Sequence, residues 1–430
     1  MKLFAGAGCG TIHFPDALFP IEGFCGIHDE PIARVLVLEC GEKAALVSLE
    51  LVMLPPELVE MVKTIVSDRT GTKKENIWVH TTHAITTPHA PHAPMGPGGV
   101  PLELGEEERQ NPDFKIKLYT DALKAAVTEA AMASGASFRP AKLGIGQAVS
   151  HICINRDVET PFGWWIGQNP EGKTNPNFDL LRLDGADGAP IAVAVIGGLK
   201  PCAIDNSRMK EGKRLVSSDV PGLACRVIED KIKAPCLFFM GAAGDQVPRE
   251  QALLEMVEPD GTAKILDFGV EKGLEIAARL GREFAEDMIP VLNQIPCNRT
   301  EAAVAVEETA LSWGGKGRIP LKPRKTVEFI QERDVRIDGN ILTLGDIALV
   351  GLKPEVNSIT AAELAEKSPC EKTILISMIN GGQKYMPDAK SYARITWEAQ
   401  NSMMMPGAAE AWVNRVVEIL HEMRGENTHE

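Results

Sequence analysis

Long apolar runs are missing from this sequence of 430 residues. No stretch approaches the ~20 apolar residues that a membrane-spanning helix requires. The segment that follows Met1 and Lys2, LFAGAGCGTIHF, is too short and too often broken by glycine to be the apolar core of a secretory signal peptide. The sequence therefore predicts a cytoplasmic protein that has no membrane partner.

Paired cysteines and an excess of basic charge are missing as well. The nine cysteines are scattered and form no CxxC pair, which predicts reduced thiols rather than a disulfide framework. Lys and Arg number 45 against 59 Asp and Glu. The net charge of −14 argues against an extended surface for nucleic acid or anionic membrane, although a local basic pocket is compatible with it. We expect a small-molecule substrate and no nucleic-acid partner, and a homo-oligomer is compatible with the sequence.

What is present is the composition of an ordinary globular protein, with 44% hydrophobic and 24% charged residues. Apolar or alternating runs predict a hairpin of strands at 35–39 and 44–51, and further strands at 77–80, 191–195, 236–240, 303–307, 327–330, 341–350 and 373–379. One-sided apolar patterns predict helices at about 56–68, 112–134, 220–231, 272–293 and 408–423. Strands and helices mix without strict βαβ alternation. We therefore predict an α/β fold, a layered αβ sandwich with mixed sheets, in a single catalytic domain over residues 1–430.

Histidine is concentrated in one place. His80, His83, His89 and His92 fall within thirteen residues, HTTHAITTPHAPH, where a predicted strand runs into a loop over 81–111 that is rich in Pro, Gly and His. Histidine is the commonest protein ligand for zinc-like metals, and a loop this long is usually functional or disordered. The spacing matches no standard zinc motif and HExxH is absent, so a solvated loop that happens to contain histidines is an equal alternative.

Four other segments combine an apolar run with an abrupt turn. They are Asn155-Arg156 after HICI, SSDVPG at 217–222, GAAGDQVP at 241–248 and GLKPEV at 351–356. Strand ends of this kind deliver side chains to the edge of a sheet, where sites form. Asp219 and Asp245 are more simply interpreted as residues that cap helices or tie turns. The aromatic segment PFGWWI at 161–166 either lines a pocket or packs in the core.

Taken in order, these segments resemble the catalytic domain of the neutral/alkaline (non-lysosomal) ceramidase family, whose members are zinc-dependent amidases. The resemblance begins with GIHDEPIAR at 26–34 and ALVSLEL at 45–51, and continues with NIWVHTTHAITTP at 76–88 and INRD at 154–157. It then includes PIAVAVIGGLKPC at 190–202, SSDVPG, GAAGDQVP, GLKPEV, and NGGQKYMPDAKSY at 380–392. The immunoglobulin-like C-terminal domain of the family is expected to be missing, because the chain ends soon after the last of these motifs.

The resemblance implies a zinc site. Two His, one Glu and one Tyr hold the metal in the family, and His83, Glu355 and Tyr385 match three of these ligands. Lys200 stands at the position of the other His, and Ile85 replaces the second His of the family's THTH element.

Lys200 leaves three alternatives open, because a protonated Lys cannot ligate a cation. The missing ligand comes from the loop, as His80, His89 or His92. Alternatively, Lys200 acts on the substrate, as a base or as a clamp for a carboxylate. In the third alternative, the site has lost its metal.

The resemblance further implies metal-dependent hydrolysis of an amide C–N bond in a small soluble substrate, with zinc-activated water as the nucleophile. Tyr385 would ligate the ion or donate to the oxyanion. Arg156 matches the family's NR element and would bind a carbonyl or carboxylate, or else form a structural ion pair. Ceramide itself is disfavoured, because the sequence shows no exposed apolar helix that would meet a bilayer. Other possibilities are a lyase or isomerase that uses Lys200 as its base, and a non-enzymatic ligand-binding protein.

Overall fold

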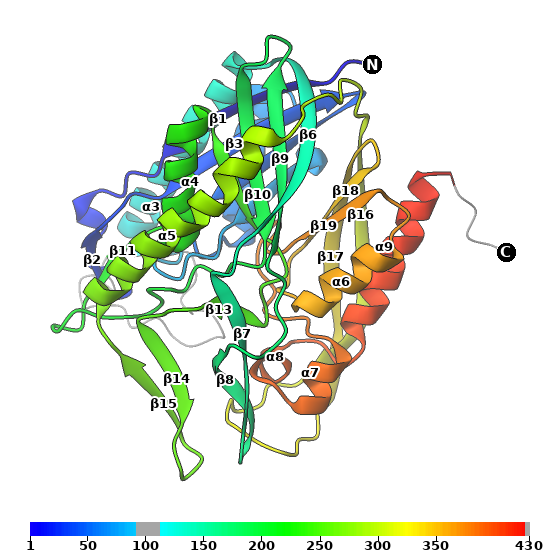
Figure 1. Cartoon of the computed structure of the whole chain (residues 1–430). Helices are drawn as coiled ribbons and strands as arrows, with labels where there is room; N and C mark the ends of the chain where they lie inside the picture. The colour runs from blue at the N-terminus through cyan, green and yellow to red at the C-terminus, as the bar shows by residue number, and fades with distance from the viewer. Residues whose placement is uncertain (92–111, 426–430) are drawn as a thin grey trace.

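The structure is a computed structural model that describes residues 1–91 and 112–425. Within these residues the largest element is an eight-stranded sheet (Figure 1). Its strands lie in the spatial order β12 (Cys236–Met240), β10 (Pro190–Gly197), β9 (Asn177–Gly185), β6 (Arg139–Val149), β1 (Phe4–Thr11), β3 (Ile32–Cys40), β4 (Glu42–Leu49) and β5 (Ile77–Thr81). The pairs β10–β12 and β4–β5 are parallel and the other pairs are antiparallel, so the sheet is mixed.

A second sheet has four strands and faces the first. Its order is β16 (Val304–Lys316), β17 (Gln331–Leu344), β18 (Ile347–Leu352) and β19 (Lys372–Ile376), and its last pair is parallel. Side chains from both sheets share one buried cluster, to which Leu38 and Trp78 contribute from one side and Leu342 and Leu349 from the other. The strands β10, β12 and β18 are almost wholly apolar because both of their faces are covered.

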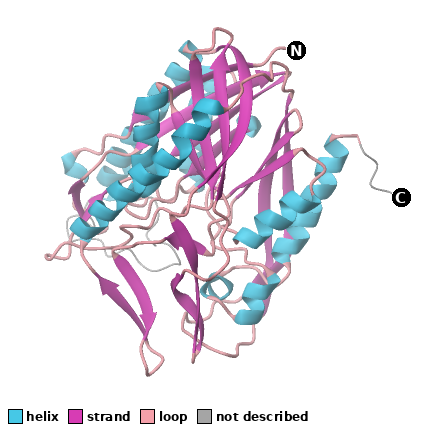
Figure 2. Cartoon of the chain, in the orientation of Figure 1, coloured by secondary structure: helices cyan, strands magenta, loops and turns pink. Residues whose placement is uncertain are grey.

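Helices cover the outer face of each sheet (Figure 2). The helices α1 (Pro56–Thr70), α3 (Pro112–Ala136), α4 (Asp219–Ile232) and α5 (Val270–Gln294) pack on the larger sheet, and α6 (Ser358–Lys367) and α9 (Ala408–Met423) pack on the smaller one. The result is a four-layered sandwich in the order helices, sheet, sheet, helices. It confirms the predicted α/β layered sandwich with mixed sheets.

Shorter elements lie at one end of the sandwich. They are the strand groups β13 (Gln246–Pro248), β7 (Cys153–Thr160) and β8 (Gly163–Asn169), β14 (Leu253–Val257) with β15 (Ala263–Asp267), and β11 (Arg214–Val216) with β2 (Phe24–Ile27), and the short helices α7 (Ala389–Arg394) and α8 (Trp397–Asn401). Figure 1 shows β7, β8, β13, α7 and α8 gathered below the two large sheets. None of the helices described is long and apolar enough to cross a membrane.

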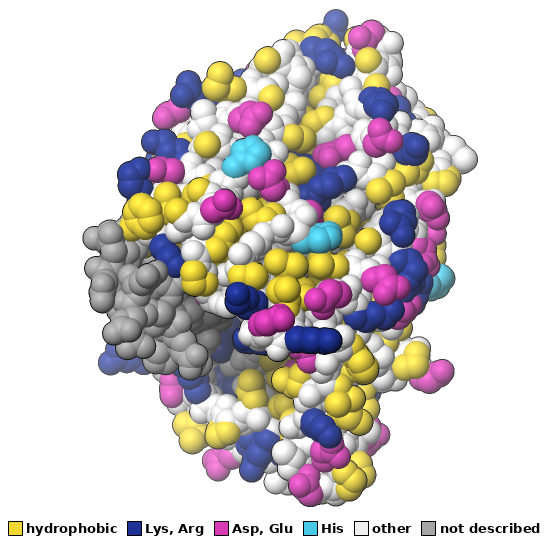
Figure 3. Space-filling model, turned by 90° about the vertical axis from the view of Figure 1, so that its left-hand side faces the viewer, with side chains coloured by type: hydrophobic (Ala, Val, Ile, Leu, Met, Phe, Trp, Pro, Cys, Tyr) yellow, Lys and Arg dark blue, Asp and Glu magenta, His cyan; other side chains and the backbone are white. Residues whose placement is uncertain are grey.

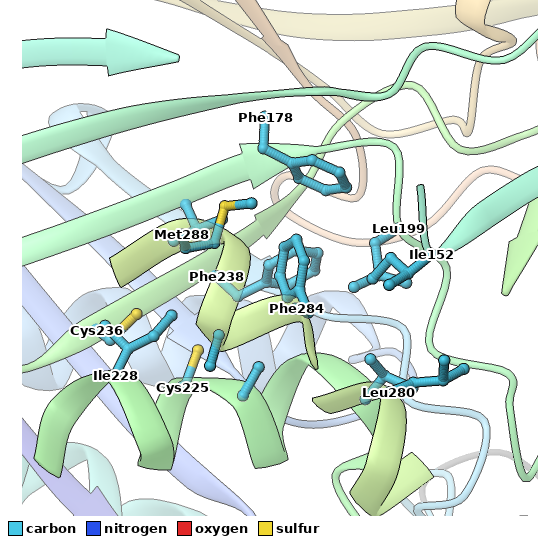
Figure 4. Close-up of a cluster of buried hydrophobic side chains, with 14 of the residues drawn as sticks. Ile152, Phe178, Leu199, Cys225, Ile228, Cys236, Phe238, Leu280, Phe284 and Met288 are labelled. Atoms are coloured by element: carbon cyan, nitrogen blue, oxygen red, sulfur yellow. The ribbon is translucent and has the colours of Figure 1, made fainter. Parts of the chain in front are cut away.

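One buried cluster includes Leu199, the residue that precedes Lys200. Phe178, Phe238 and Phe284 pack between the sheet and the helices α4 and α5, and Leu199 lies in the same cluster (Figure 4). Leu199 is fully buried, so the core fixes the backbone of the next residue, Lys200. On the surface drawn in Figure 3, Lys and Arg side chains are interspersed with Asp and Glu, and neither sign dominates that face.

Two sequence predictions of strands were wrong in detail. Residues 327–330 form no strand, because the pairing with β16 begins only at Gln331 and the Ile330 side chain is 66% exposed. Residues 341–350 are not one strand but parts of β17 and β18, joined by a turn in which Gly345 has a φ of 64°. That left-handed conformation suits glycine, which has no Cβ to clash. The predicted hairpin became β3 and β4, and the five predicted helices are α1, α3, α4, α5 and α9.

Candidate functional site

The candidate site lies where loops from the two large sheets meet. Lys200 comes three residues after β10 of the larger sheet, and Glu355 comes three residues after β18 of the smaller sheet. The Tyr385 backbone pairs directly with that of Glu355, since Met386 N donates to Glu355 O at 2.8 Å and Glu355 N donates to Lys384 O at 2.8 Å. This pairing fixes the two side chains relative to each other.

The Lys200 side chain reaches both of these residues. Its Nζ donates to Glu355 Oε2 at 2.6 Å and to the Tyr385 hydroxyl oxygen at 2.6 Å. All three residues are buried, with exposed fractions of 2% for Lys200, 3% for Glu355 and 5% for Tyr385. The ammonium group therefore lies inside the protein, held between a carboxylate and a phenol.

The charge state of this trio follows from its contacts. Burial opposes the charged form of Lys200, but Glu355 and Tyr385 outweigh it and raise the pKa of Lys200 above its usual value. Burial likewise opposes the charged form of Glu355, but neighbouring groups, Lys200 first among them, outweigh it and lower the pKa of Glu355. Burial and the Glu355 charge raise the pKa of Tyr385. At neutral pH the site therefore holds an ammonium, a carboxylate and a neutral phenol.

His83 completes the cluster from the loop after β5. Its Nδ1 lies 3.0 Å from the Val52 carbonyl oxygen, an acceptor, so Nδ1 carries the proton. The other ring nitrogen, Nε2, lies 3.3 Å from Glu355 Oε1. Burial lowers the pKa of His83 and outweighs the attraction of Glu355, so the neutral ring presents a lone pair at Nε2. His83 has a φ of 64°, a conformation that a non-glycine residue adopts at a cost and that is frequent at functional sites.

Arg156, on β7, also contacts Tyr385. Its Cζ lies 5.3 Å from the centre of the Tyr385 ring and 5.1 Å from that of Trp397, and the two rings meet edge to face. Its Nε donates to Glu398 Oε1 at 2.7 Å, and Glu398 is fully buried. Glu398 therefore balances the guanidinium charge, while the cation–π contact with Arg156 and the edge-to-face contact with Trp397 hold the Tyr385 ring in place.

A second carboxyl group faces Glu398. Asp157 Oδ1 and Glu398 Oε2 are both buried, and neither has a donor among the residues described. Burial, followed by the charges of Glu398 and Asp245, raises the pKa of Asp157 well above its usual range. A proton on Asp157 satisfies both oxygens, so the pair carries one negative charge, which Arg156 neutralises.

Asp219 and Asp245 tie the loops that carry the site, as the simpler sequence interpretation proposed. The Asp219 carboxylate accepts from the backbone nitrogens of Ala203, Ile204 and Val220, at 3.2, 3.1 and 2.7 Å, and so anchors the loop just after Lys200. The Asp245 carboxylate accepts from the nitrogen and the hydroxyl of Ser358 at the start of α6, at 2.9 and 2.7 Å. Each therefore fixes a loop next to a central residue.

A small cavity opens beside the Lys200 side chain. Its volume is about 50 Å³, which corresponds to roughly three to five water molecules. Polar side chains of both charges line it, together with Ile85, Ile166 and other apolar residues; the charged ones are Arg156, Lys200, Asp205 and Glu255. The aromatic segment at 161–166 thus contributes Ile166 to the wall, whereas Trp165 is buried.

His80 and His89, which were also predicted as possible metal ligands, contact residues outside the candidate site. His80 is fully buried on β5, its Nε2 accepts from Met240 N at 3.0 Å, and burial lowers its pKa to about 3. His89 contacts Glu22, with its Nδ1 3.1 Å from Glu22 Oε2. His92, and the predicted loop from residue 92 to 111, lie outside the described residues. The structure thus brings together His83, Lys200, Glu355, Tyr385 and Arg156.

Sequence reasoning missed several residues of this site. Glu398 and Trp397 stand in no recognised motif, and the Val52 carbonyl oxygen, as a backbone atom, leaves no trace in the sequence. Asp157 directly follows Arg156 in the INRD segment, which was the only available signal for it.

The layered sandwich is a neutral-ceramidase-like fold. The neutral ceramidase from Pseudomonas aeruginosa superposes with a TM-score of 0.70 over 100% of this chain and 76% of that chain, at 13% sequence identity. A structure described as ceramidase complexed with C2 gives a TM-score of 0.69 with the same coverage and identity. No family model matches the sequence, and a search of curated proteins finds no match. At this identity the likeness establishes the fold.

The zinc ion implied by the sequence resemblance does not fit this arrangement of side chains. No three His, Cys, Asp or Glu side chains within residues 1–91 and 112–425 come together as a metal site. At the candidate site His83 and Glu355 lie together with the Tyr385 phenol and the Lys200 ammonium. The ammonium donates hydrogen bonds to Glu355 and Tyr385, which are two of the three expected ligands. A protonated amine has no lone pair for a metal.

Proposed function

We propose that this protein is a hydrolase that cleaves an amide C–N bond in a small polar substrate. The observation that carries the proposal is the contact of Lys200 Nζ with Glu355 and Tyr385, at 2.6 Å each, beside His83, whose Nε2 lies 3.3 Å from Glu355 Oε1. A fixed cation, a phenol and a histidine lone pair are the groups that an acyl transfer to water requires.

His83 is the proposed general base. Its Nε2 takes a proton from a water molecule while the water oxygen attacks the amide carbon. The same proton, now on the imidazolium, passes to the leaving nitrogen as the C–N bond breaks, which gives a carboxylic acid and an amine. The Val52 carbonyl, 3.0 Å from Nδ1, holds the ring in the tautomer that this step needs.

Lys200 and Tyr385 are the proposed donors to the oxyanion. Lys200 Nζ has three N–H groups, of which two point at Glu355 and Tyr385, so the third is available to a substrate oxygen. Because the Tyr385 oxygen accepts from Lys200, its own O–H remains free to donate. Fixed donors in a buried site stabilise developing negative charge more than water does.

Two observations support the substrate class. The amide bond rests on the neutral-ceramidase-like fold and on the order of the sequence segments that resemble that family. The small polar substrate is supported by the cavity of about 50 Å³ beside Lys200, which is lined by charged side chains of both signs. Zinc-dependent catalysis stays a prediction of the sequence resemblance, and no step of this proposal uses it.

The lyase or isomerase alternative is less well supported. A lysine that serves as a general base needs a pKa below its usual value, whereas Glu355 and Tyr385 raise the pKa of Lys200. A ligand-binding protein remains the second candidate, since the same groups would bind a carboxylate or amide without turning it over.

The test is a screen of short N-acyl amides with polar amine groups, in which the released amine is quantified. His83→Gln and Lys200→Met are each expected to lower kcat by at least about 100-fold, because each removes a group that acts on the reacting atoms. His89→Gln is the matched control, because His89 contacts Glu22 instead of the cluster, and it should keep full activity. Full activity in both His83→Gln and Lys200→Met would refute the proposed roles. Stoichiometric binding of an amide without release of amine would favour the binding protein.

A further inference from the structure

We infer that the Lys200 ammonium replaces a metal ion, and that the groups around it form a zinc site that lacks one ligand. The wild-type chain then binds no zinc here, and the single substitution Lys200→His creates a zinc site. This inference concerns ion binding, and it holds whether or not the protein hydrolyses amides.

The donors around Lys200 are of the kinds that zinc prefers. They are an imidazole nitrogen from His83, a carboxylate from Glu355 and a phenol oxygen from Tyr385, and nitrogen and oxygen atoms of this kind bind zinc at about 2.0–2.2 Å. Lys200 Nζ lies 2.6 Å from an atom of each of the last two. Glu355 Oε1 lies 3.3 Å from His83 Nε2, so the three donors converge on one small volume.

These donors are held in place by groups other than the lysine. His83 Nδ1 is bound to the Val52 carbonyl oxygen at 3.0 Å, which is the kind of second contact that orients a metal-ligating histidine. The backbone pairing of Glu355 with Tyr385 holds those two side chains together. The Tyr385 ring also has a cation–π contact with Arg156 and an edge-to-face contact with Trp397. Removal of Lys200 should therefore leave three donors close to their present positions.

The ammonium group and a zinc ion exclude each other at this site. Lys200 donates hydrogen bonds to the oxygens of Glu355 and Tyr385 that a metal would have to share, and it is itself a cation within bonding distance of them. Like charges this close repel strongly in a buried site. The Lys200 side chain is only 3% exposed, and Leu199 anchors its backbone in the core, so it has little room to swing away.

The test measures zinc binding in chelator-treated full-length protein by isothermal titration calorimetry with Zn²⁺ alone. Three proteins are compared: wild type, Lys200→His and Lys200→Met, each checked for folding by circular dichroism. We expect no zinc binding at the site in wild type and one zinc per chain in Lys200→His, with an affinity at least about 100-fold higher than that of wild type. Lys200→Met, which removes the cation without adding a ligand, should bind more weakly than Lys200→His but more tightly than wild type.

The ligand set is checked by adding Glu355→Gln to Lys200→His, which should abolish the new binding. A wild-type protein that binds one zinc per chain, and loses it in Glu355→Gln, would overturn the inference. So would a folded Lys200→His protein that binds no zinc. If Lys200→His does not fold, the comparison of wild type with Lys200→Met decides the question. Because no substrate is involved, a failure of the hydrolase proposal leaves these outcomes unchanged.

Discussion

Removal of the buried ammonium gives the sharpest test of how the candidate site is held together. Lys200→Met keeps most of the side-chain volume but removes the cation that neutralises the Glu355 carboxylate. Glu355 is only 3% exposed, so water cannot replace that cation. Breaking a buried ion pair from one side costs about 3–5 kcal/mol. We expect the lower end, about 3 kcal/mol, because the Tyr385 hydroxyl could turn to donate to Glu355 once Lys200 is gone.

The double variant measures the interaction energy between Lys200 and Glu355 apart from their contacts with other residues. Glu355→Gln alone should also cost about 3 kcal/mol, since it leaves the Lys200 ammonium buried without a carboxylate. Lys200→Met with Glu355→Gln removes both charges and should cost about 3 kcal/mol instead of the sum of about 6, a coupling of about 3 kcal/mol. Urea unfolding followed by tryptophan fluorescence measures each value, as the shift in midpoint at unchanged slope.

The pKa shifts of Glu355 and Lys200 predict how the destabilisation by Lys200→Met changes with pH. Glu355 has a lowered pKa, so its contribution is present above its unfolded value and is lost as pH falls through the folded value. Lys200 has a raised pKa, so its contribution is present below its unfolded value of 10.5 and is lost as pH rises through the folded value. The destabilisation by Lys200→Met should therefore be full at pH 7 and shrink in acid.

The matched control is Lys272→Met. Lys272 and Glu275 also form an ion pair, at 2.9 Å, but both side chains lie in solvent, so no measurable change in stability is expected. The reasoning is refuted if Lys200→Met is no more destabilising than this control, or if the two single changes at the site are additive.

Three further predictions follow from other parts of the structure. If neutral His83 is the general base, kcat/KM should rise with pH through a pKa below 6.5 and stay level at neutral pH, which a pH–rate profile measures. Asp157→Asn should match wild type near pH 4 and become progressively more stable than it as pH rises, because the raised pKa of Asp157 costs the wild-type fold stability above the unfolded value of 3.8. Asp157→Ala should instead cost about 1–3 kcal/mol, since it leaves Glu398 Oε2 without a donor. Gly10→Ala should cost about 1–3 kcal/mol in thermal or urea unfolding, because a Cβ there would lie 2.1 Å from the Ala126 carbonyl oxygen on α3.

Each of these has a result that contradicts it. A kcat/KM that is still rising above pH 7 would exclude His83 as the base. Asp157→Asn that loses stability relative to wild type as pH rises would mean that Asp157 is ionised. For Gly10 the control is Gly188→Ala, whose Cβ meets nothing within 4 Å; because Gly188 has a φ of 83°, any loss at that position reports backbone strain alone.

The sequence predicted the elements whose signal is local. The helix at 56–68 shows its apolar face and an opening proline, and the hairpin of β3 and β4 shows two apolar runs around Gly41, which has a φ of 88°. The strand β1 was not predicted, because its sequence FAGAGCGT has too many glycines for a strand pattern. The structure gives the reason: Gly6, Gly8 and Gly10 face α3, and a Cβ at any of them would meet the helix backbone or side chains within 2.5 Å. Such glycines mark close approach of another element.

The candidate site was predictable only in part, because its residues are far apart in the sequence. Lys200 and Glu355 are separated by 155 positions, and no pattern of spacing relates them. The resemblance to a family placed them in one site, and the structure brings them into contact. Neither residue spacing nor the family resemblance could reveal Glu398, since this residue balances the charge of Arg156, which is 242 positions away. Long-range electrostatic pairing leaves no local trace.

The contacts at the junction of the two sheets also set the order in which the protein can become competent during synthesis. Both buried cations, Arg156 and Lys200, come from the first half of the chain, and both carboxylates that neutralise them, Glu355 and Glu398, come from the last fifth. A ribosome adding 5–20 residues per second needs roughly 10–40 s to travel from Lys200 to Glu398. Throughout that interval Arg156, on β7, and Lys200, after β10, lack the carboxylates that neutralise them in the folded protein. The ion pairs of the candidate site are therefore complete only after Glu398 has been synthesised.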